Sequence, residues 1–203
     1  MEKQKKQKII VSDVALDKIV KSASNGDEMA FSQIVKIFQN EIYNMAMYIT
    51  QNREDALDAS QEVFIKLWRS LPGFRGECSI KSYIMKLTKN TSLDIVRKQS
   101  RNQSTSLTVE NEKGDEVELD IADDSEDSNP EKSYLRQEKI QKVRDAIGKL
   151  DIDQRQIIIM RDINGMSYCE IADTLGINEG TVKSRLNRAR SELKKILLEG
   201  NYF

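Results

Sequence analysis

Hydrophobic and polar positions divide the chain into two helical stretches with a polar stretch between them. In residues 25–101 apolar side chains recur three or four positions apart, and the same spacing returns in residues 134–203. Residues 102–133 hold no apolar period longer than one turn. The pattern predicts an all-α fold of two small helical domains joined by a flexible linker, with residues 1–24 as an N-terminal extension.

The first helical stretch contains start and stop signals for several helices. Apolar positions in residues 30–49 predict one or two core-facing helices. Asn52 and the acids that follow it predict the start of the next helix, which Pro72 and Gly73 end. Ser79 is a typical N-cap for a further helix. We expect the core-facing residues to be Leu57, Phe64, Trp68 and Leu71 in the former helix, and Ile80, Tyr83, Ile84, Leu87 and Thr91 in the latter.

The second helical stretch ends its helices at glycines. Gly165 and Gly176 stand where the apolar period breaks, and glycine adopts the left-handed conformation that closes many helices. The predicted helices cover about residues 134–150, 153–164, 167–175 and 179–198.

Charge is distributed unevenly along the chain. Residues 1–101 carry a net charge of +5, residues 102–133 of −9 and residues 134–203 of +3, which together give the overall −1. Two basic stretches around an acidic one suggest two modules that face nucleic acid, with ordinary surface variation as the open alternative. Within the acidic stretch, residues 116–121 alternate in a way that could form a hairpin edge turning at Gly114.

Composition removes several classes of function. The chain has two cysteines and no histidine, so it cannot form a disulfide framework, a Cys/His zinc site or a histidine-based triad. We expect no cofactor and no metal, and we expect Cys78 and Cys169 to be buried, inert thiols rather than redox sensors. The N-terminal lysines precede only three apolar residues, and no apolar run approaches bilayer length. These features predict a cytoplasmic protein.

Residues 167–185 have the residue pattern of a helix-turn-helix. Ala172 is small enough for two helices to cross closely, and Gly176 can form the turn between them. The space between the helices would be filled by Ile171, Leu175, Ile177, Val182 and Leu186.

The helix expected over residues 179–198 has two opposed faces. At about 100° per residue, the apolar side holds Val182, Leu186, Ala189 and Leu193. The other side holds Ser184, Asn187, Arg188 and Ser191, with Lys183, Arg185 and Arg190 on its flanks. No acid occurs from Thr181 to Ser191, whereas a merely solvated helix more often carries Glu and Lys pairs. Short polar side chains with arginine suit the major groove, and flanking cations suit phosphates, so we predict DNA reading.

Two stretches together resemble one family. Residues 54–68 read EDALDASQEVFIKLW and are followed by FRGE at 74–77, and this combination resembles the second conserved region of bacterial sigma-70-type sigma factors. The tract from Leu150 to Arg190 resembles their fourth region. The resemblance covers about residues 25–101 and 136–198 in the family's order, and the short connection between them is similar to the extracytoplasmic-function (ECF, group 4) class.

The resemblance implies a function and an organisation. It implies promoter-specific initiation of transcription by bacterial RNA polymerase, often in a stress response, and no enzyme activity. Sigma region 2 would occupy residues 25–101, the acidic linker residues 102–133, and sigma region 4, with the helix-turn-helix, residues 134–203. The linker would follow the RNA path through the polymerase, where its acids imitate RNA phosphates. A simple tether is the alternative.

The resemblance also implies where the polymerase binds. Asp58, Gln61, Glu62 and Ile65 lie side by side on their predicted helix, away from its expected core face. In the family, the matching aspartate, amide and acid bind the coiled coil of the polymerase β′ subunit, and the β flap is a further contact. Without the resemblance, a solvated polar face would explain these residues equally well. Most of the class is also held inactive by an anti-sigma factor, which is therefore an expected partner.

Promoter DNA is expected to contact both regions. In the family, the stretch matching Phe74 to Lys81 captures and flips a base of the −10 element. The candidate −10 residues are Phe74, Arg75, Ser79, Lys81, Lys86 and Lys89, and the candidate −35 residues are Thr181, Lys183, Ser184, Arg185, Asn187 and Arg188. Phe74 could equally anchor its loop in the core. The family usually has tryptophan where Tyr83 stands, a departure that we expect to alter packing more than recognition.

Two other classes of protein are alternatives to a sigma factor. A repressor or activator would read DNA with the same helix-turn-helix, but it would need a ligand pocket or an apolar dimer face in the first domain. A metal-dependent nuclease would need converging acids, yet the acids here lie in the linker or on the outer face that carries Asp58 and Glu62. Specific transcripts from added core polymerase would distinguish a sigma factor from both.

Overall fold

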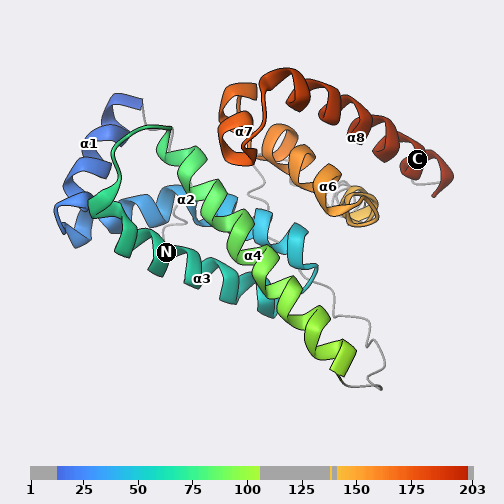
Figure 1. The fold of residues 1–203 in the computed structure, drawn as a ribbon, viewed down its shortest axis with the longest axis horizontal. Helices are drawn as coiled ribbons and strands as arrows, with labels where there is room; N and C mark the ends of the chain where they lie inside the picture. The colour runs from blue at the N-terminus through green and yellow to red at the C-terminus, as the bar shows by residue number, and fades with distance from the viewer. Residues whose placement is uncertain (1–12, 106–137, 139–140, 201–203) are drawn as a thin grey trace, which may run out of the picture.

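The computed structural model describes residues 13–105, 138 and 141–200, and these residues contain helices and no strand (Figure 1). The N-terminal unit, residues 13–105, comprises α1 (Asp13–Ser24), α2 (Glu28–Thr50), α3 (Arg53–Ser70), the 3₁₀ turn η1 (Leu71–Gly73) and α4 (Ile80–Thr105). The C-terminal unit, residues 141–200, comprises a helical segment at 141–148, α6 (Ile152–Ile158), the π-helical turn η2 (Ile159–Ile163), α7 (Tyr168–Leu175) and α8 (Glu179–Glu199). The all-α prediction is confirmed.

Two expectations fall beyond the described ranges. The predicted linker lies outside them from residue 106 onward, and so does the possible hairpin at 116–121. Within those ranges, no helix has the length and apolar content needed to cross a membrane.

The long helix α2 forms the centre of the N-terminal unit. The Asp27 side chain caps its start by accepting hydrogen bonds from the backbone N–H groups of Met29 and Ala30, at 2.9 and 3.0 Å. The stretch predicted as one or two helices is a single helix, because its apolar face continues to point inward over its whole length. The buried residues are Ala30, Ile34, Phe38, Ile42, Met45, Ala46 and Ile49.

Helix α1 was not anticipated within the expected N-terminal extension. Val20 and Ala23 are buried and Leu16 and Ile19 pack against the core. These four residues are three or four positions apart, so the helical period was present in the sequence.

Helix α3 is rotated relative to the prediction. Leu57 was expected in the core but is 44% exposed, and Phe64 and Trp68 are half-buried, with the Trp68 ring 4.8 Å from that of Phe31. Of the predicted four, only Leu71 is fully buried. The residues that α3 buries are Ala56, Ala59, Ser60, Val63 and Leu67. Small Ala56 and Ala59 cluster with Ala46 of α2, which allows the two helices to approach closely and turns the larger Leu57 outward.

Helix α4 begins as predicted. The Ser79 hydroxyl accepts a hydrogen bond from the Ser82 backbone N–H at 3.1 Å, as an N-cap does. Of the predicted inward residues, Ile80, Ile84 and Thr91 are buried while Tyr83 and Leu87 are half-buried. The C-terminal end of the helix projects away from the rest of the molecule (Figure 1).

The C-terminal unit has its breaks at the predicted glycines. Gly165 and Gly176 have φ values of 64° and 67°, in the left-handed region that favours glycine. The predicted helix over 153–164 is divided into α6 and η2, and Ser167 begins α7.

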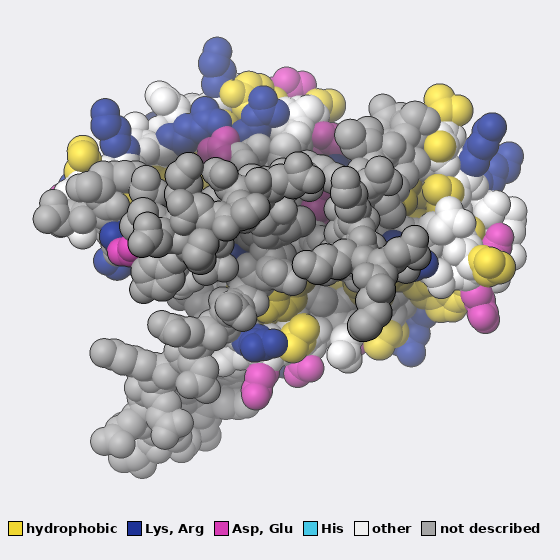
Figure 2. Space-filling model, turned by 180° about the vertical axis from the view of Figure 1, so that it is seen from behind, with side chains coloured by type: hydrophobic (Ala, Val, Ile, Leu, Met, Phe, Trp, Pro, Cys, Tyr) yellow, Lys and Arg dark blue, Asp and Glu magenta, His cyan; other side chains and the backbone are white. Residues whose placement is uncertain are grey.

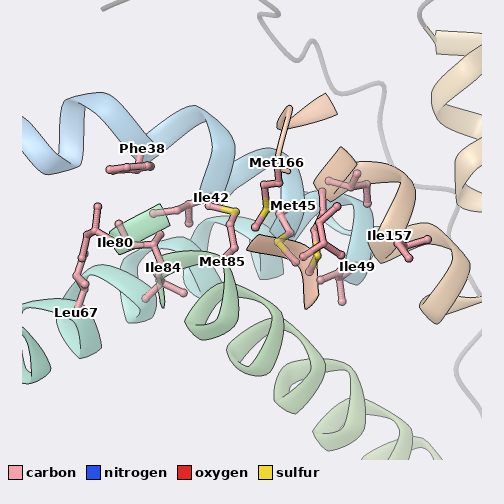
Figure 3. Close-up of a cluster of buried hydrophobic side chains, with 14 of the residues drawn as sticks. Phe38, Ile42, Met45, Ile49, Leu67, Ile80, Ile84, Met85, Ile157 and Met166 are labelled. Carbon is pink, nitrogen blue, oxygen red and sulfur yellow. The ribbon is translucent and has the colours of Figure 1, made fainter. Parts of the chain in front are cut away.

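The two units share one hydrophobic core, which their prediction as separate domains did not anticipate. Figure 3 shows Met166, which follows η2, beside Met45 of α2, with Met85 of α4 close by. Ile49 of α2 and Ile157 of α6 belong to the same buried cluster. The relative position of the two units is therefore held by packed side chains as well as by the chain that connects them.

Candidate functional site

The outer side of α3 carries an exposed group of acidic, amide and apolar residues. Asp58, Gln61, Glu62 and Ile65 are all exposed, as predicted, and Ile65 is 44% exposed. The rotation of α3 adds Leu57, which was expected in the core. We call Leu57, Asp58, Gln61, Glu62 and Ile65 the α3 patch. The patch therefore combines two exposed aliphatic side chains with two acids and an amide, groups that a partner protein can contact.

The loop before α4 is anchored by an aromatic contact. The Phe74 ring lies 5.2 Å from the Tyr83 ring at an interplanar angle of 45°, and both residues are half-buried. This contact favours the loop-anchoring interpretation of Phe74. Arg75 beside it is exposed.

The candidate −10 residues on α4 do not form one open surface. Lys86 is exposed, whereas desolvation by burial, followed by the charge of Lys86, lowers the pKa of half-buried Lys89. Ser79 donates a hydrogen bond to Glu170 Oε1 at 3.1 Å. Lys81 Nζ donates to the Asn164 carbonyl oxygen at 2.6 Å. Ser79 and Lys81 therefore contact the C-terminal unit in this structure.

The helix-turn-helix is built by two capped helices. A reciprocal capping box begins α7: the Glu170 N–H donates to Ser167 Oγ at 3.2 Å, and the Ser167 N–H donates to Glu170 Oε2 at 2.9 Å. Asn178 Oδ1 caps α8 by accepting from the Thr181 N–H at 2.7 Å. The predicted wedge is formed, with Ile171, Val182 and Leu186 buried and Leu175 and Ile177 half-buried.

The side of α8 opposite its buried residues is open. The candidate −35 residues that are exposed are Lys183, Ser184, Arg185, Asn187 and Arg188. Thr181 is half-buried and donates its hydroxyl to Asn178 at 2.8 Å, so it helps to cap the helix. Figure 2 shows Lys and Arg side chains gathered along the edge of the molecule where α8 lies. The geometry leaves this helix free to enter a groove of DNA.

Two shallow hollows flank the exposed side of α8. One is lined by Tyr168, Lys183, Ser184 and Asn187, among others. The other is lined by Asp151, Asp153, Arg185 and Arg188, among others. The two acids beside the arginines were not anticipated from the sequence, because Asp151 precedes α6 and Asp153 lies in its first turn, and both come close to α8 only in the fold.

Arg190, predicted as a flanking cation, forms an ion pair with Asp162 of η2. Its Nε donates to Asp162 Oδ2 at 3.1 Å, and its Nη2 contacts Oδ1 of the same carboxylate. The hydrogen bond that Arg190 donates to Asp162 raises the pKa of Arg190 above its usual value. This bidentate pair links α8 to η2.

Comparison with known proteins places these features in a family. The sequence profile of Sigma-70 region 2 matches residues 34–102, and that of Sigma-70, region 4 matches residues 140–193. The chain is 31% identical over 183 residues to the RNA polymerase sigma-H factor of Pseudomonas aeruginosa, covering 88% of this chain and 92% of that protein. It is 32% identical over 181 residues to the ECF RNA polymerase sigma-E factor of Escherichia coli K12, covering 86% and 90%. The chain is an ECF sigma factor of the sigma-70 family.

Two solved structures share the fold of this sigma factor. CnrH, solved in complex with the cytosolic domain of CnrY, has a TM-score of 0.63 at 22% identity and covers 89% of this chain and 95% of its own. The sigma factor RpoE of Bartonella quintana, solved with the anti-sigma factor NepR, has a TM-score of 0.64 at 24% identity and covers 82% and 96%. Sigma factors act with RNA polymerase in promoter-directed initiation and are not enzymes, and this chain shares that role.

The thiols of this sigma factor differ from the expectation. Both were expected to be buried, but Cys169 is exposed in the first turn of α7 and Cys78 is half-buried in the loop before α4. Both residues lie at the start of a helix, where the chain is at the surface rather than in the core. Burial, followed by the negative charge of Asp173, raises the pKa of the Cys78 thiol, which makes it less reactive. Within the described part of this sigma factor, no group of three or more acids or cysteines is arranged to hold a metal ion.

We expect Glu170 to make the stability of this sigma factor depend on acid pH. Burial raises its pKa, but hydrogen bonds from Ser167 and Ser79 and the charge of Lys81 outweigh burial and hold the pKa below its usual value. The contribution of Glu170 to the free energy of unfolding is therefore fully present above the ordinary glutamate pKa of about 4.3. It is lost as the pH falls through the lower pKa of the folded state. We would measure the midpoint temperature of thermal unfolding from neutral to acid pH. This temperature should fall less steeply with pH for Glu170→Gln than for the unchanged chain. Glu199→Gln, at the exposed end of α8, should decline as the unchanged chain does.

Proposed function

We propose that this ECF sigma factor directs core RNA polymerase to promoters by reading two DNA elements, the −35 element with α8 and the −10 element with the loop and first turns of α4. The observation that carries the proposal is the exposed side of α8, which lies opposite the buried Val182, Leu186 and Ala189 and holds the candidate residues Lys183, Ser184, Arg185, Asn187 and Arg188. Cations and short polar side chains are the groups that contact phosphates and base edges.

At the −35 element, α8 lies in the major groove. Arg188 and Arg185 are long enough to reach base edges, and arginine bonds guanine O6 and N7 bidentately. Ser184 and Asn187 allow close approach because they are short, while Lys183 binds a phosphate.

At the −10 element, the first domain holds a separated strand. Arg75 and Lys86 are exposed and offer charge to the backbone, while Ser79 and Lys81 contribute once they are released from the C-terminal unit. No catalytic group is needed for melting. Binding of unstacked bases offsets the few kcal/mol that each opened step costs.

The polymerase is held at more than one place. The α3 patch binds the coiled coil of the β′ subunit, and region 4 binds the β flap.

We assign residues 1–24 to an N-terminal extension, 25–101 to region 2, 102–133 to a linker that follows the RNA path, and 134–203 to region 4. The protein acts where the polymerase acts, in the cytoplasm.

An anti-sigma factor is the remaining proposed partner. CnrH and the Bartonella quintana RpoE were each solved with a partner, which is named as an anti-sigma factor in the case of NepR. A protein that covers the α3 patch or α8 would block the polymerase or the promoter, and either would keep this chain inactive.

The proposed function is tested by adding the 203-residue chain to purified core RNA polymerase and fragmented bacterial DNA. We expect new transcripts that start at a small set of positions, each preceded by common sequences near −10 and −35. Core polymerase alone and the protein alone are the controls. Binding of the protein to specific DNA without polymerase, with no new transcripts, would instead indicate a repressor or activator.

A further inference from the structure

The exposed side of α8 has two different flanks. One flank, which includes Lys183, borders a hollow whose described lining residues include no acid. The other flank, which includes Arg185 and Arg188, borders a hollow that is also lined by the acids Asp151 and Asp153. Acids therefore share a hollow with the two arginines of this flank but not with Lys183.

The fold brings the two acids to α8 through α6. Figure 1 shows α6 lying alongside α8, and the two helices are packed together. Asp151 is the N-cap of α6, and its Oδ1 accepts a hydrogen bond from the Gln154 N–H at 2.8 Å. Asp153 lies in the first turn and is exposed. Asp151 is therefore engaged in starting the helix, whereas no hydrogen bond or ion pair with a described residue engages the Asp153 carboxylate.

The arginines on the other wall of this hollow have room to move. Both are exposed, and the hollow has a volume of about 760 Å³, so their side chains can change rotamer within it. On a helical wheel at about 100° per residue, Arg188 lies between Ser184, which points outward, and Arg185 on the flank. Arg188 can therefore reach both a DNA groove and the hollow that holds Asp153.

An arginine on a DNA-binding helix can bind either a phosphate or a guanine edge. Phosphates are present at every step of the DNA and attract any exposed cation, whatever the sequence. A carboxylate beside the guanidinium repels phosphates, but it does not oppose hydrogen bonds to the uncharged guanine O6 and N7. The guanidinium has five N–H donors, so two bonds to guanine leave others for a carboxylate. A neighbouring acid therefore favours base reading over phosphate binding.

We infer that Asp153 is a specificity-determining residue for the −35 element: with DNA bound, its carboxylate accepts a hydrogen bond from Arg188 and directs the guanidinium to a guanine edge. The inference rests on the proposed function, because it takes Arg188 to read a base. Asp153 acts through Arg188, so it is a positioning residue and needs no DNA contact of its own. Lys183, which shares its hollow with no described acid, binds a phosphate.

The test measures binding of holoenzyme, formed from the 203-residue chain and core polymerase, to promoter libraries randomised in the −35 element. Asp153→Asn keeps the size of the side chain and removes its charge. The preference for guanine at one position should fall several-fold, while binding to unrelated sequences becomes tighter. The slope of log affinity against log salt concentration should steepen by up to about one, because Arg188 is then able to bind a phosphate. Asp153→Glu, which keeps the carboxylate, should retain most of the preference.

A double-mutant cycle tests whether Asp153 acts through Arg188. Arg188→Ala should itself remove the preference at that position, and adding Asp153→Asn should change the preference no further. Asp173→Asn is the matched control, because it makes the same change at an exposed position of α7 outside the hollow. This control should keep the preference of the unchanged chain. Circular dichroism shows whether each variant keeps its helicity.

A second possible neighbour of Asp153 is Lys89 of α4. Burial, followed by the charge of Lys86, lowers the pKa of Lys89, and the charge of Asp153 opposes this lowering. The same variants are therefore also measured on a library randomised in the −10 element. A change in preference confined to the −10 element would show that Asp153 acts on Lys89, and it would overturn the inference.

Two further results would overturn the inference. One is an Asp153→Asn holoenzyme whose −35 preference is unchanged or stronger. The other is a loss of preference that Asp153→Asn causes equally when Arg188 is already alanine. An unchanged chain whose holoenzyme shows no −35 preference at all counts against the proposed function instead.

Discussion

Replacing Asp58 and Glu62 together with arginine is expected to abolish binding of this sigma factor to core RNA polymerase while its fold stays intact. Both acids are exposed on α3, and the ion pair of Glu62 with Lys66, at 3.5 Å, is itself exposed, so its loss costs the folded chain little. A polymerase surface that is complementary to two acids repels two arginines. Loss of central interface contacts costs about 2–4 kcal/mol, or roughly 30-fold to nearly 1,000-fold in affinity.

The measurement is the affinity of each variant for core polymerase, with circular dichroism as the test of folding. Asp17→Arg combined with Glu199→Arg is the matched control, because it makes the same charge change at exposed positions on α1 and α8. The control should bind as the unchanged chain does. A reversed α3 patch that keeps native affinity and native helicity would show that the polymerase binds elsewhere.

Arg188→Ala and Lys183→Ala are expected to weaken promoter binding in different ways. If Arg188 reads a base edge, its loss should cost about 1–3 kcal/mol and relax the preference at one position of the −35 element. Lys183 is proposed to hold a phosphate, so its loss should weaken all sequences about equally. It should also lower the slope of log affinity against log salt concentration by about one.

The two variants are compared as holoenzymes on promoter libraries varied in the −35 element and at several salt concentrations. Lys195→Ala, at an exposed position further along α8, serves as a control for charge alone. A uniform loss for Arg188→Ala, with no change in sequence preference, would mean that α8 is a phosphate clamp and that bases are read by other residues.

Local signals in the sequence predicted the elements well. Ser79, Gly165 and Gly176 mark helix ends because capping and left-handed glycine depend on a few neighbouring residues only. The two faces of α8 follow from its own periodicity, so its five exposed polar candidates were identified without the fold. The α3 patch was predicted in part, and Asp58, Gln61, Glu62 and Ile65 are exposed as expected.

What the sequence did not reveal depends on contacts between distant residues. Leu57 was placed in the core because large apolar residues dominate a helical wheel, but the small Ala56 and Ala59 set the face that packs on α2. The contact of Ser79 with Glu170 joins positions far apart in the chain, and no local pattern marks such a pair. For the same reason, the six −10 candidates could be named from the family resemblance and their chemistry, but the partial covering of that surface could not be foreseen.

The shared core has a consequence for how the protein unfolds. Met166 belongs to the C-terminal unit, yet its side chain is buried beside residues of α2 and α4 in the N-terminal unit. Unfolding either unit therefore exposes apolar surface of the other, and the free energies of the two are not independent. Heating the protein should melt both units in one cooperative transition, as if they were a single domain. A single melting transition would then come from the contact between the N-terminal and C-terminal units, and not from either unit by itself.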